Sequence, residues 1–358
     1  MNYIFVHLLN DMSGSPRVLS DLIKNFPSEG KKILLTNGTR GFLDCQDVDG
    51  VYKIFYVLKS NVYIKLLLYI LSQIQMFFVL FFLLLSIRYK REERSTVIIN
   101  TVLPFGAALA AHLLSDKVVY YIHETSIRPY LLNKFLAKIV RIAADEVIFV
   151  SYYVKHFYEH VAEGKKCHVI YNPLRSDFNC NTLSKCCPFD ERYILYVGTL
   201  KEYKGIFNLI KLASMLSHKQ FVAVINEDVD VYNNFMSDNE IPLNLRFEIR
   251  PQNLAEIYSR ALFTLNLSLP NLCIETFGLT LLESMHFSVP VIAPNYGGPK
   301  EIVNEHVGFL VEPSELVNIK NIILNTDEAL WNMLSSNSFQ HSKKFDLENY
   351  VCKISKII

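Results

Sequence analysis

The stretch "ETFGLTLLES", residues 275–284, places two glutamates eight positions apart with only uncharged residues between them. In one continuous helix, eight positions would rotate the second carboxylate about 80° from the first, so the pair would not share a face. The stretch is better explained by a turn at Gly278, followed by a helix with one apolar face. Glu275 then precedes this helix, and Glu283 lies within it.

The turn and helix lie between two short apolar runs, and the same alternation recurs along the whole chain. Strands are predicted at 3–9, 31–36, 51–57, 96–100, 117–122, 146–150, 167–171, 193–197, 220–226, 245–249, 262–267, 289–293 and 308–311. Helices are predicted between them at 16–26, 104–115, 130–143, 205–217, 277–287 and 314–325. Such alternation indicates an α/β fold with parallel sheets covered by helices.

The chain has 358 residues, more than one hydrophobic core usually supports. We expect an N-terminal Rossmann-like domain at 1–172 and a C-terminal one at 193–340, facing each other across a cleft. Residues 173–192 lack periodicity and are predicted to be the linker. Residues 341–358 are expected to form a helix that packs back toward the N-terminal domain. Open parallel sheets bind ligands at the carboxyl ends of their strands, so the site is expected there.

Composition narrows the function further. A net charge of +1 argues against a nucleic-acid binder that relies on bulk charge. The seven cysteines include no CxxC pair, which favours reduced thiols in a cytosolic protein and no zinc site. The N-terminus resembles a first strand rather than a signal peptide. Two "DVD" segments, 47–49 and 228–230, have no supporting carboxylates, so no metal site is expected.

Residues 62–87 are the most hydrophobic segment of the chain and are long enough to span a bilayer. Lys65, Gln73 and Gln75 interrupt the segment, and strands predicted on both sides of it belong to one sheet. We therefore expect one or two helices lying in the membrane interface; a buried helix and a true span are the alternatives. The expected membrane contacts are Phe77, Phe78, Phe81, Phe82, Arg88, Lys90 and Arg91.

Three loops carry side chains suited to chemistry. In "VGTLKEYKG" (197–205), Lys204 is predicted at a helix N-terminus, where a diphosphate would be stabilised. In "NDMSGSPRVL" (10–19), Gly14 allows close approach of a phosphate or an acceptor. In "YYIHETSIRP" (120–129), His123 follows a buried strand at the expected cleft. The alternatives are a surface lysine, an ordinary turn and a structural histidine.

Taken together, these pieces resemble the retaining glycosyltransferases of the GT-B fold, family 4. Glu275 and Glu283 with the residues between them resemble that family's E-x-F-G-L-x-x-x-E motif. "YVGTLKEYKGI" resembles its V-G-x-L-x-x-x-K-G, although Thr199 stands where an arginine is common. "FEIRP" also departs from the family pattern and supplies Arg250 at the region expected to recognise the base.

The resemblance implies that Glu275 approaches the donor sugar and that Glu283 holds the ribose hydroxyls. It also implies that backbone amides of residues 278–280 face the sugar and the β-phosphate, which explains the uncharged spacer. We expect His123, Glu275 and Lys204 to be the catalytic residues. The expected donor-binding residues are Gly14, Thr199, Lys204, Arg250, Glu275, Gly278, Leu279, Thr280 and Glu283.

The function expected from this resemblance is transfer of a sugar from a UDP- or GDP-sugar, with retention, to a glycan or polyprenyl-linked acceptor. The context would be bacterial surface polysaccharide biosynthesis, such as lipopolysaccharide or capsule. The enzyme would need no cofactor or metal and would lie in the cytoplasm, on the inner face of the cell membrane. The alternatives are a nucleotide-sugar epimerase of the same fold, a glycoside hydrolase and a non-enzymatic membrane-associated protein.

Overall fold

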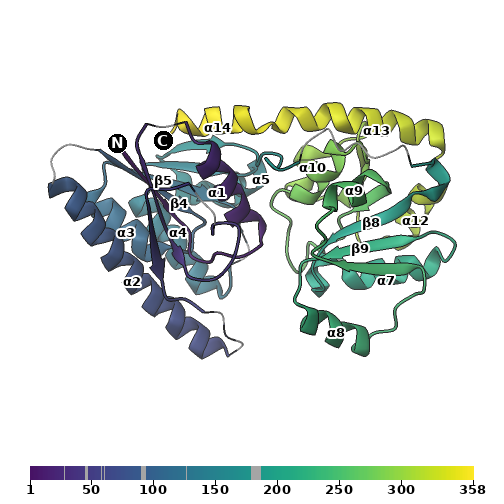
Figure 1. The fold of residues 1–358 in the computed structure, drawn as a ribbon, viewed down its shortest axis with the longest axis horizontal. Coiled ribbons are helices and arrows are strands. Elements are labelled where there is room, and N and C mark those ends of the chain that lie inside the picture. The colour runs from purple at the N-terminus through teal and green to yellow at the C-terminus, as the bar shows by residue number, and fades with distance from the viewer. Residues whose placement is uncertain are drawn as a thin grey trace. The chain divides into compact units, whose positions relative to one another are not determined.

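The computed structural model describes residues 1–27, 29–44, 47–57, 59, 61–89, 94–125, 127–178 and 187–358. The chain forms two compact units (Figure 1). Unit 1 comprises Met1–Pro173 together with Leu347–Ile358, and unit 2 comprises Leu174–Asp346. Each unit is a parallel sheet covered by helices, so the predicted α/β fold with two Rossmann-like domains is confirmed.

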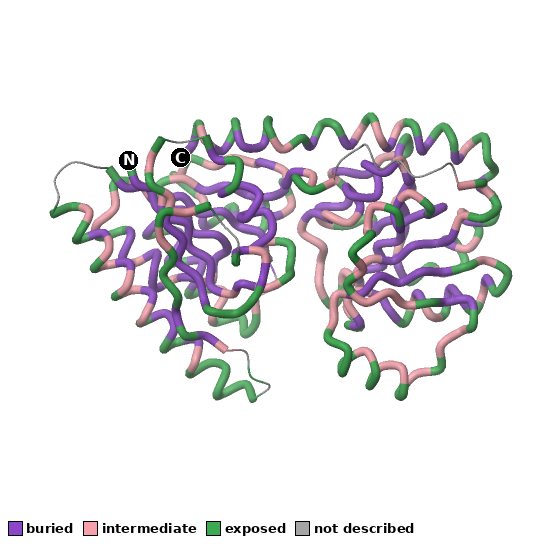
Figure 2. Tube along the Cα trace, in the orientation of Figure 1, coloured by how far each residue is buried: buried purple, intermediate pink, exposed green. Residues whose placement is uncertain are grey.

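Unit 1 contains a seven-stranded sheet in the order β3-β2-β1-β4-β5-β6-β7, in which all neighbours pair in parallel. Its strands are β1 (Asn2–Val6), β2 (Lys31–Asn37), β3 (Gly50–Ile54), β4 (Ser95–Asn100), β5 (Lys117–Ile122), β6 (Glu146–Phe149) and β7 (Lys166–Val169). The central strands are apolar and buried on both faces, as parallel strands covered by helices on both sides must be (Figure 2).

The helices of unit 1 are α1 (Gly14–Asn25), α2 (Val62–Tyr89), α3 (Phe105–Leu114), α4 (Tyr130–Ala143), α5 (Tyr152–Phe157), α6 (Glu159–Ala162) and α14 (Leu347–Ser355). Right-handed crossovers put α2, α3 and α4 on one face of the sheet, because these three connections all run in the same direction across it. The connection through α1 runs the opposite way, so α1 covers the other face, where it contacts α14 (Figure 1).

Helix α2 is one continuous helix of 28 residues, and it is long and apolar enough by composition to cross a membrane. It nevertheless connects β3 to β4 within one sheet, because β1 pairs with β4 over five residues. Ser72 and Gln73 of α2 are buried, and Gln73 Oε1 accepts a hydrogen bond from the Gly106 amide at 3.0 Å. A Cβ at Gly106 would lie 1.9 Å from the Gln73 carbonyl oxygen, so this close helix contact requires glycine.

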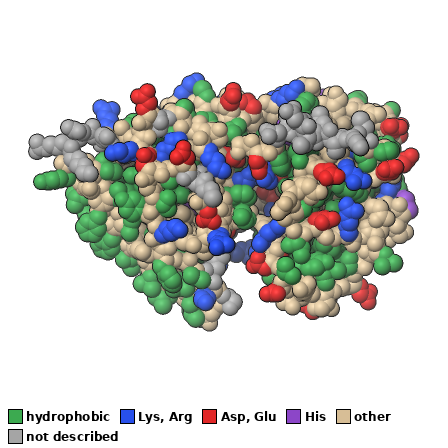
Figure 3. Space-filling model, in the orientation of Figure 1, with side chains coloured by type: hydrophobic (Ala, Val, Ile, Leu, Met, Phe, Trp, Pro, Cys, Tyr) green, Lys and Arg blue, Asp and Glu red, His purple; other side chains and the backbone are tan. Residues whose placement is uncertain are grey.

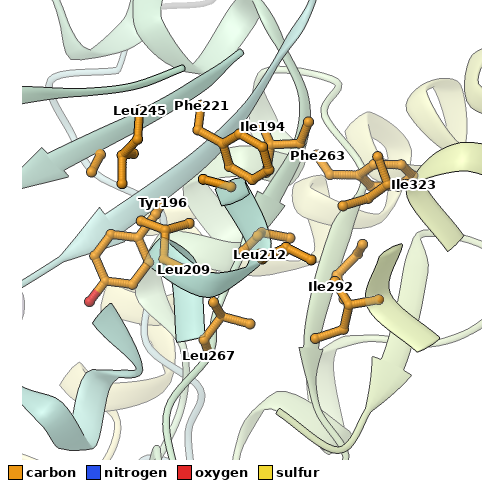
Figure 4. Packing of buried hydrophobic residues seen from close by; sticks show 14 of the residues in the cluster. Ile194, Tyr196, Leu209, Leu212, Phe221, Leu245, Phe263, Leu267, Ile292 and Ile323 are labelled. Atoms are coloured by element: carbon orange, nitrogen blue, oxygen red, sulfur yellow. The ribbon is translucent and has the colours of Figure 1, made fainter. Parts of the chain in front are cut away.

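Unit 2 contains a six-stranded parallel sheet in the order β10-β9-β8-β11-β12-β13. Its strands are β8 (Tyr193–Gly198), β9 (Phe221–Ile225), β10 (Leu245–Ile249), β11 (Ala261–Leu265), β12 (Val291–Pro294) and β13 (Gly308–Val311). Its helices are α7 (Ile206–Met215), α8 (Val229–Asp238), α9 (Leu254–Ser259), α10 (Leu279–His286), α11 (Pro299–Ile302), α12 (Leu316–Asn325) and α13 (Glu328–Ser342). Ile194, Leu209, Phe221 and Phe263 belong to its main buried apolar cluster (Figure 4).

The C-terminal region differs from the sequence-based expectation. The last helix was expected at 341–358, but α14 begins only at Leu347, and a separate helix, α13, precedes it in unit 2. The sequence analysis missed α13 because its buried face is partly polar, including Ser335 and Ser338, which weakens the apolar periodicity. Of the predicted linker 173–192, residues 179–186 lie outside the described part of the chain.

Candidate functional site

The candidate site lies at the carboxyl edge of the sheet in unit 2. Strands β8, β11 and β12 are adjacent and parallel, so the loops that follow them emerge at the same edge. These loops contain Lys204 after β8, Glu275 after β11, and the Gly297–Gly298 turn after β12. A Cβ at Gly297 would lie 2.3 Å from the carbonyl oxygen of Glu275, so the last two loops are in direct contact.

Lys204 and Glu275 form an ion pair although 71 positions separate them in the sequence. Lys204 Nζ donates a hydrogen bond to Glu275 Oε2 at 2.7 Å, with side-chain exposures of 30% and 20%. Burial alone would lower the pKa of Lys204, but the neighbouring carboxylate raises it. Burial alone would raise the pKa of Glu275, but Lys204 and a hydrogen bond from Asn266 lower it. Both groups are therefore charged at neutral pH, and the Lys204 ammonium is a positive charge at a fixed place in the site.

The loop carrying Lys204 is held in place by backbone contacts. Gly205 adopts a left-handed conformation with φ of 80°, and a Cβ there would lie 2.1 Å from the Leu267 carbonyl oxygen. The Leu269 amide donates to the Tyr203 carbonyl at 2.9 Å, which joins the two loops. Tyr196 on β8 donates its hydroxyl to the Thr199 carbonyl at 2.9 Å. These contacts hold the backbone of the loop, and the ion pair with Glu275 holds the ammonium group of Lys204.

Lys204 directly precedes the helix that the sequence predicted near Gly205. It ends a single 3₁₀ turn (Glu202–Lys204), Gly205 is the N-cap, and α7 begins at Ile206. Lys204 is not the exposed surface lysine of the alternative explanation, because its ammonium pairs with Glu275. The left-handed Gly205 breaks the helix here, because its close approach to Leu267 redirects the chain.

The N-terminus of α10 supplies backbone donors at the same edge. Gly278 has φ of 105°, a conformation that glycine adopts without strain, and α10 begins at Leu279. No side chain caps this helix, and the first amides of any helix have no intrahelical partner. The amides of Leu279 and Thr280 therefore lie in the first turn of the helix that follows Glu275, where the helix dipole favours an anion.

Glu283 lies one turn further along α10 and is buried. Its Oε2 accepts a hydrogen bond from the Tyr258 hydroxyl at 2.8 Å. Its carboxylate also contributes to raising the pKa of Arg175, against the lowering effect of burial and alongside the Asp177 hydrogen bond. Glu283 is thus held by Tyr258, whereas Glu275 is held by Lys204 and Asn266.

Thr199 and Arg250 lie at the same sheet edge but in different surroundings. Thr199 follows β8 directly, and its buried Oγ1 has no hydrogen-bond partner within the part of the chain that the structure describes. Arg250 follows β10, on the far side of β9 from β8. Its guanidinium bonds to Asn226 Oδ1 at 2.8 Å and to Asp228 at 3.0 Å.

Sequence reasoning missed Asn266, which hydrogen-bonds the Glu275 carboxylate. Asn266 is the first residue after β11, so a polar residue directly following a buried strand was the available signal. Tyr196 was also missed, because an apolar ring within a strand resembles ordinary core. In both cases the function of the residue depends on a loop that lies far away in the sequence.

A second polar cluster lies in unit 1, at the carboxyl ends of β1, β4 and β5. His123 Nε2 contacts Asn100 Oδ1 at 2.9 Å, and Asn100 Nδ2 contacts His7 Nδ1 at 3.0 Å. Burial, and then His7, lowers the pKa of His123 to about 3, so its ring is neutral at pH 7. Burial also raises the pKa of Glu124 to about 7. Gly14 is the exposed first residue of α1, also in unit 1.

This cluster predicts a pH-dependent stability of unit 1. A histidine with a native pKa of about 3 and an ordinary pKa of 6.5 takes up a proton only on unfolding between those values, so stability falls as pH falls. His123→Gln should therefore flatten the slope of unfolding free energy by about 1.4 kcal/mol per pH unit between about pH 4 and 6. The raised pKa of Glu124 makes unfolding free energy change with pH in the opposite direction. This contribution is the same in the variant and in the unsubstituted protein, so it does not affect their difference.

The measurement is urea unfolding at a series of pH values, followed by hydrogen exchange of the β5 backbone. The matched control is His160→Gln, because His160 is exposed in the same unit and should leave the slope unchanged. Equal slopes for His123→Gln and the unsubstituted chain would contradict the buried, neutral assignment of His123.

One aspartate of each "DVD" segment bonds to a neighbouring group of the protein. Asp49 accepts a hydrogen bond from the Lys32 amide at 2.8 Å, and Asp228 pairs with Arg250. Within the described ranges, no group of three or more His, Cys, Asp or Glu side chains is arranged to hold a metal ion.

Comparison with known proteins shows what this part of the chain is similar to. Residues 187–338 match the family model described as glycosyl transferases group 1. The matched region contains the Lys204 loop, Glu275 and the whole of α10. The chain is a glycosyltransferase.

Relatives of this glycosyltransferase are distant in sequence. A protein of Methanocaldococcus jannaschii described as an uncharacterized glycosyltransferase is 25% identical over 266 residues, which cover 70% of each chain. The sucrose-phosphate synthase of Spinacia oleracea is 27% identical over 113 residues, 30% of this chain and 11% of that protein. The match thus covers only about a tenth of the length of the plant enzyme.

Solved structures show the same fold over the full length. Anabaena HepE in complex with UDP is 18% identical, with a TM-score of 0.74, and the match covers 100% of this chain and 99% of that one. Sucrose-phosphate synthase from Thermosynechococcus elongatus is 16% identical, with a TM-score of 0.74 and coverage of 99% and 98%. The glycosyltransferase therefore has the GT-B fold that the sequence predicted.

Proposed function

We propose that this glycosyltransferase is a retaining enzyme of family 4 that takes its sugar from a UDP- or GDP-sugar. The Lys204–Glu275 pair, at the same sheet edge as the N-terminus of α10, carries the proposal. Lys204 Nζ and Glu275 Oε2 lie 2.7 Å apart. The ammonium can bind a diphosphate, and the carboxylate can accept hydrogen bonds from sugar hydroxyls. The presence of UDP and UDP-glucose in the HepE structures supports a uridine donor.

The chemistry asked of the site is departure of a nucleoside diphosphate. The bond between the anomeric carbon and the diphosphate oxygen breaks, and its electron pair goes to that oxygen. Lys204 Nζ and the first amides of α10 would stabilise the developing charge without reorganising, because backbone contacts already fix them. The acceptor hydroxyl then attacks the same face of the oxocarbenium-like sugar, and its proton passes to the departing diphosphate.

The positions of the other site residues indicate which part of the donor each would contact. Glu275 would accept hydrogen bonds from the donor sugar, while Lys204 also contacts the β-phosphate. Glu283, held by Tyr258, would bind the ribose hydroxyls. Neutral His123 would hydrogen-bond the reacting sugar rather than act as a base, because its pKa is about 3.

The test is calorimetry of the full chain with a panel of UDP-sugars, GDP-sugars and the free nucleotides. We expect one base to bind, with the sugar adding affinity. Product analysis with an acceptor should give the same anomeric configuration as the donor. Binding of no nucleotide would overturn the proposal, and conversion of the donor sugar without an acceptor would indicate an epimerase.

Activity is expected to survive chelation by EDTA. The charge of the departing diphosphate is assigned to Lys204 and backbone amides, and the described carboxylates form no cation site. The measurement compares initial rates before and after EDTA treatment. Loss of activity with rescue by manganese or magnesium would instead place the enzyme among metal-dependent transferases.

We also propose that the protein is cytoplasmic, lies on the inner face of the cell membrane and acts on a glycan or polyprenyl-linked acceptor in bacterial surface polysaccharide biosynthesis. Helix α2 supports this, because its polar Ser72 and Gln73 are buried while its outer face is apolar. Phe78 and Phe82 are 51% and 62% exposed, and hydrophobic side chains gather over α2 in Figure 3. Such a face is costly in water and stable in a membrane interface.

The other expected membrane contacts fall into three groups. Phe77 and Phe81 are half-buried and stack on each other with ring centroids 5.7 Å apart. Arg88 is exposed at the end of α2. Lys90 and Arg91 lie outside the described residues.

A further inference from the structure

Helix α4 presents a mixed basic and apolar stripe to solvent. Its buried side carries Leu136, Ile139 and Val140, which face the sheet. Its exposed residues recur at helical spacing and therefore lie along the opposite side. They are Tyr130, Leu131, Lys134, Phe135, Lys138, Arg141 and Ile142. A helix with this pattern suits an interface between water and hydrocarbon, where basic side chains extend toward anions.

The stripe on α4 and the exposed apolar residues of α2 lie on the same side of the sheet in unit 1. Both helices cover the same face of the sheet in unit 1, with the short helix α3 between them. The ring of Tyr69 on α2 contacts that of Phe105 on α3 at 5.8 Å. Phe105 in turn contacts Phe135 of the α4 stripe at 5.1 Å. We call the outward side of α2, α3 and α4 the helical face.

The charges of this helical layer are all of one sign. Its described helices contain neither Asp nor Glu. Its Lys and Arg residues are Lys65, Arg88, Lys134, Lys138 and Arg141. A second copy of the chain docked by a two-fold axis would bring the same basic surface against itself, which like charges disfavour. A bilayer of anionic lipids complements both the positive charge and the exposed apolar side chains of the helical face.

We propose that α4 is the headgroup-binding element of this face, and that Lys134, Lys138 and Arg141 bind the phosphates of anionic lipids. The inference rests on the membrane association proposed above, and it assigns a cationic contact to α4. Lys134 Nζ lies 4.7 Å from the centroid of the Tyr130 ring, so an aromatic ring adjoins the basic stripe. Aromatic and basic side chains together are typical of surfaces at headgroup level.

The experiment is flotation of the full chain with phosphatidylcholine vesicles, with and without phosphatidylglycerol, at low and high salt. K134Q/K138Q/R141Q should lower partition onto anionic vesicles on the order of 100-fold at low salt, because each charge contributes about fivefold. The variant should differ little from the unsubstituted chain at high salt or on neutral vesicles. Replacing both lysines with arginine, K134R/K138R, should preserve binding.

The matched control is K24Q/K353Q/K356Q, which removes the same charge from exposed lysines on α1 and beside or on α14, at the opposite face of the same sheet. It should retain most binding. Equal losses in both triple variants would overturn the assignment to α4, because net charge alone would explain them.

Further outcomes separate this inference from the proposal beneath it. If K134Q/K138Q/R141Q binds normally while loss of the α2 phenylalanines releases the protein, α4 is excluded and membrane association stands. If the unsubstituted chain binds no vesicle, membrane association itself fails. If light scattering shows a dimer that the α2 substitutions dissociate, the helical face is an interface between copies and the inference is overturned.

Discussion

Replacing Lys204 by alanine is expected to weaken binding of the nucleotide-sugar donor by about 10- to 100-fold, because a charged hydrogen bond to phosphate is worth about 1.5–3 kcal/mol. The same change should lower the stability of unit 2 by about 1–3 kcal/mol, because it leaves the Glu275 carboxylate without its cation. Calorimetry measures the first effect. Fluorescence of Trp331, the single tryptophan and part of the buried cluster of unit 2, measures the second.

Two variants separate binding from stability. Lys201→Ala removes an exposed lysine from the same loop and should change neither quantity much. Lys204→Met with Glu275→Gln removes both charges, so it should recover stability but not donor binding or transfer. Unchanged donor affinity in Lys204→Ala would remove this lysine from the site and leave the ion pair as a purely structural feature.

Replacing Phe78 and Phe82 by serine is expected to release the protein from vesicles, with a loss of partition on the order of 10³-fold. Each ring removed from an apolar environment costs about 2 kcal/mol or more. Donor binding should not change, because α2 carries none of the residues assigned to the donor. Transfer to a lipid-linked acceptor should therefore fall more than hydrolysis of the donor. Flotation and both rates are the measurements.

The matched control is Phe157→Ser with Phe207→Ser, which removes two partly exposed rings outside α2. It should leave vesicle binding intact. Protease protection tests the topology: protection of residues 1–60 with digestion of 95–358 would mean that α2 spans the membrane. That result would also contradict the pairing of β1 with β4.

The sequence predicted only part of the charged site around Glu275. The spacing of Glu275 and Glu283, with a glycine turn between them, marked the loop and the helix. It did not show that Glu275 would meet Lys204 from a loop 71 positions away, nor that Asn266 would hold the same carboxylate. Those contacts exist because β8 and β11 are neighbours in the sheet, and strand order is a tertiary property.

For α2, the sequence predicted a helix and its apolar composition, but not its orientation. Gln73 and Gln75 looked like interruptions of an apolar run. In the structure they bond to the backbone of Gly106 and Phe55, so they tie the helix to unit 1 and leave the apolar side outward. A periodic pattern cannot show this, because it normally places the polar side in water.

The sequence by itself determined the alternation of strands and helices, because the periods of buried residues and the turn-forming glycines are local properties. It also determined which loops carry charge. Only the tertiary structure decided the ionisation of those groups: His123 is neutral because it is buried near His7, and Lys204 stays charged because Glu275 faces it. Protonation depends on the surroundings of a side chain, and these are built from residues that are distant in the sequence.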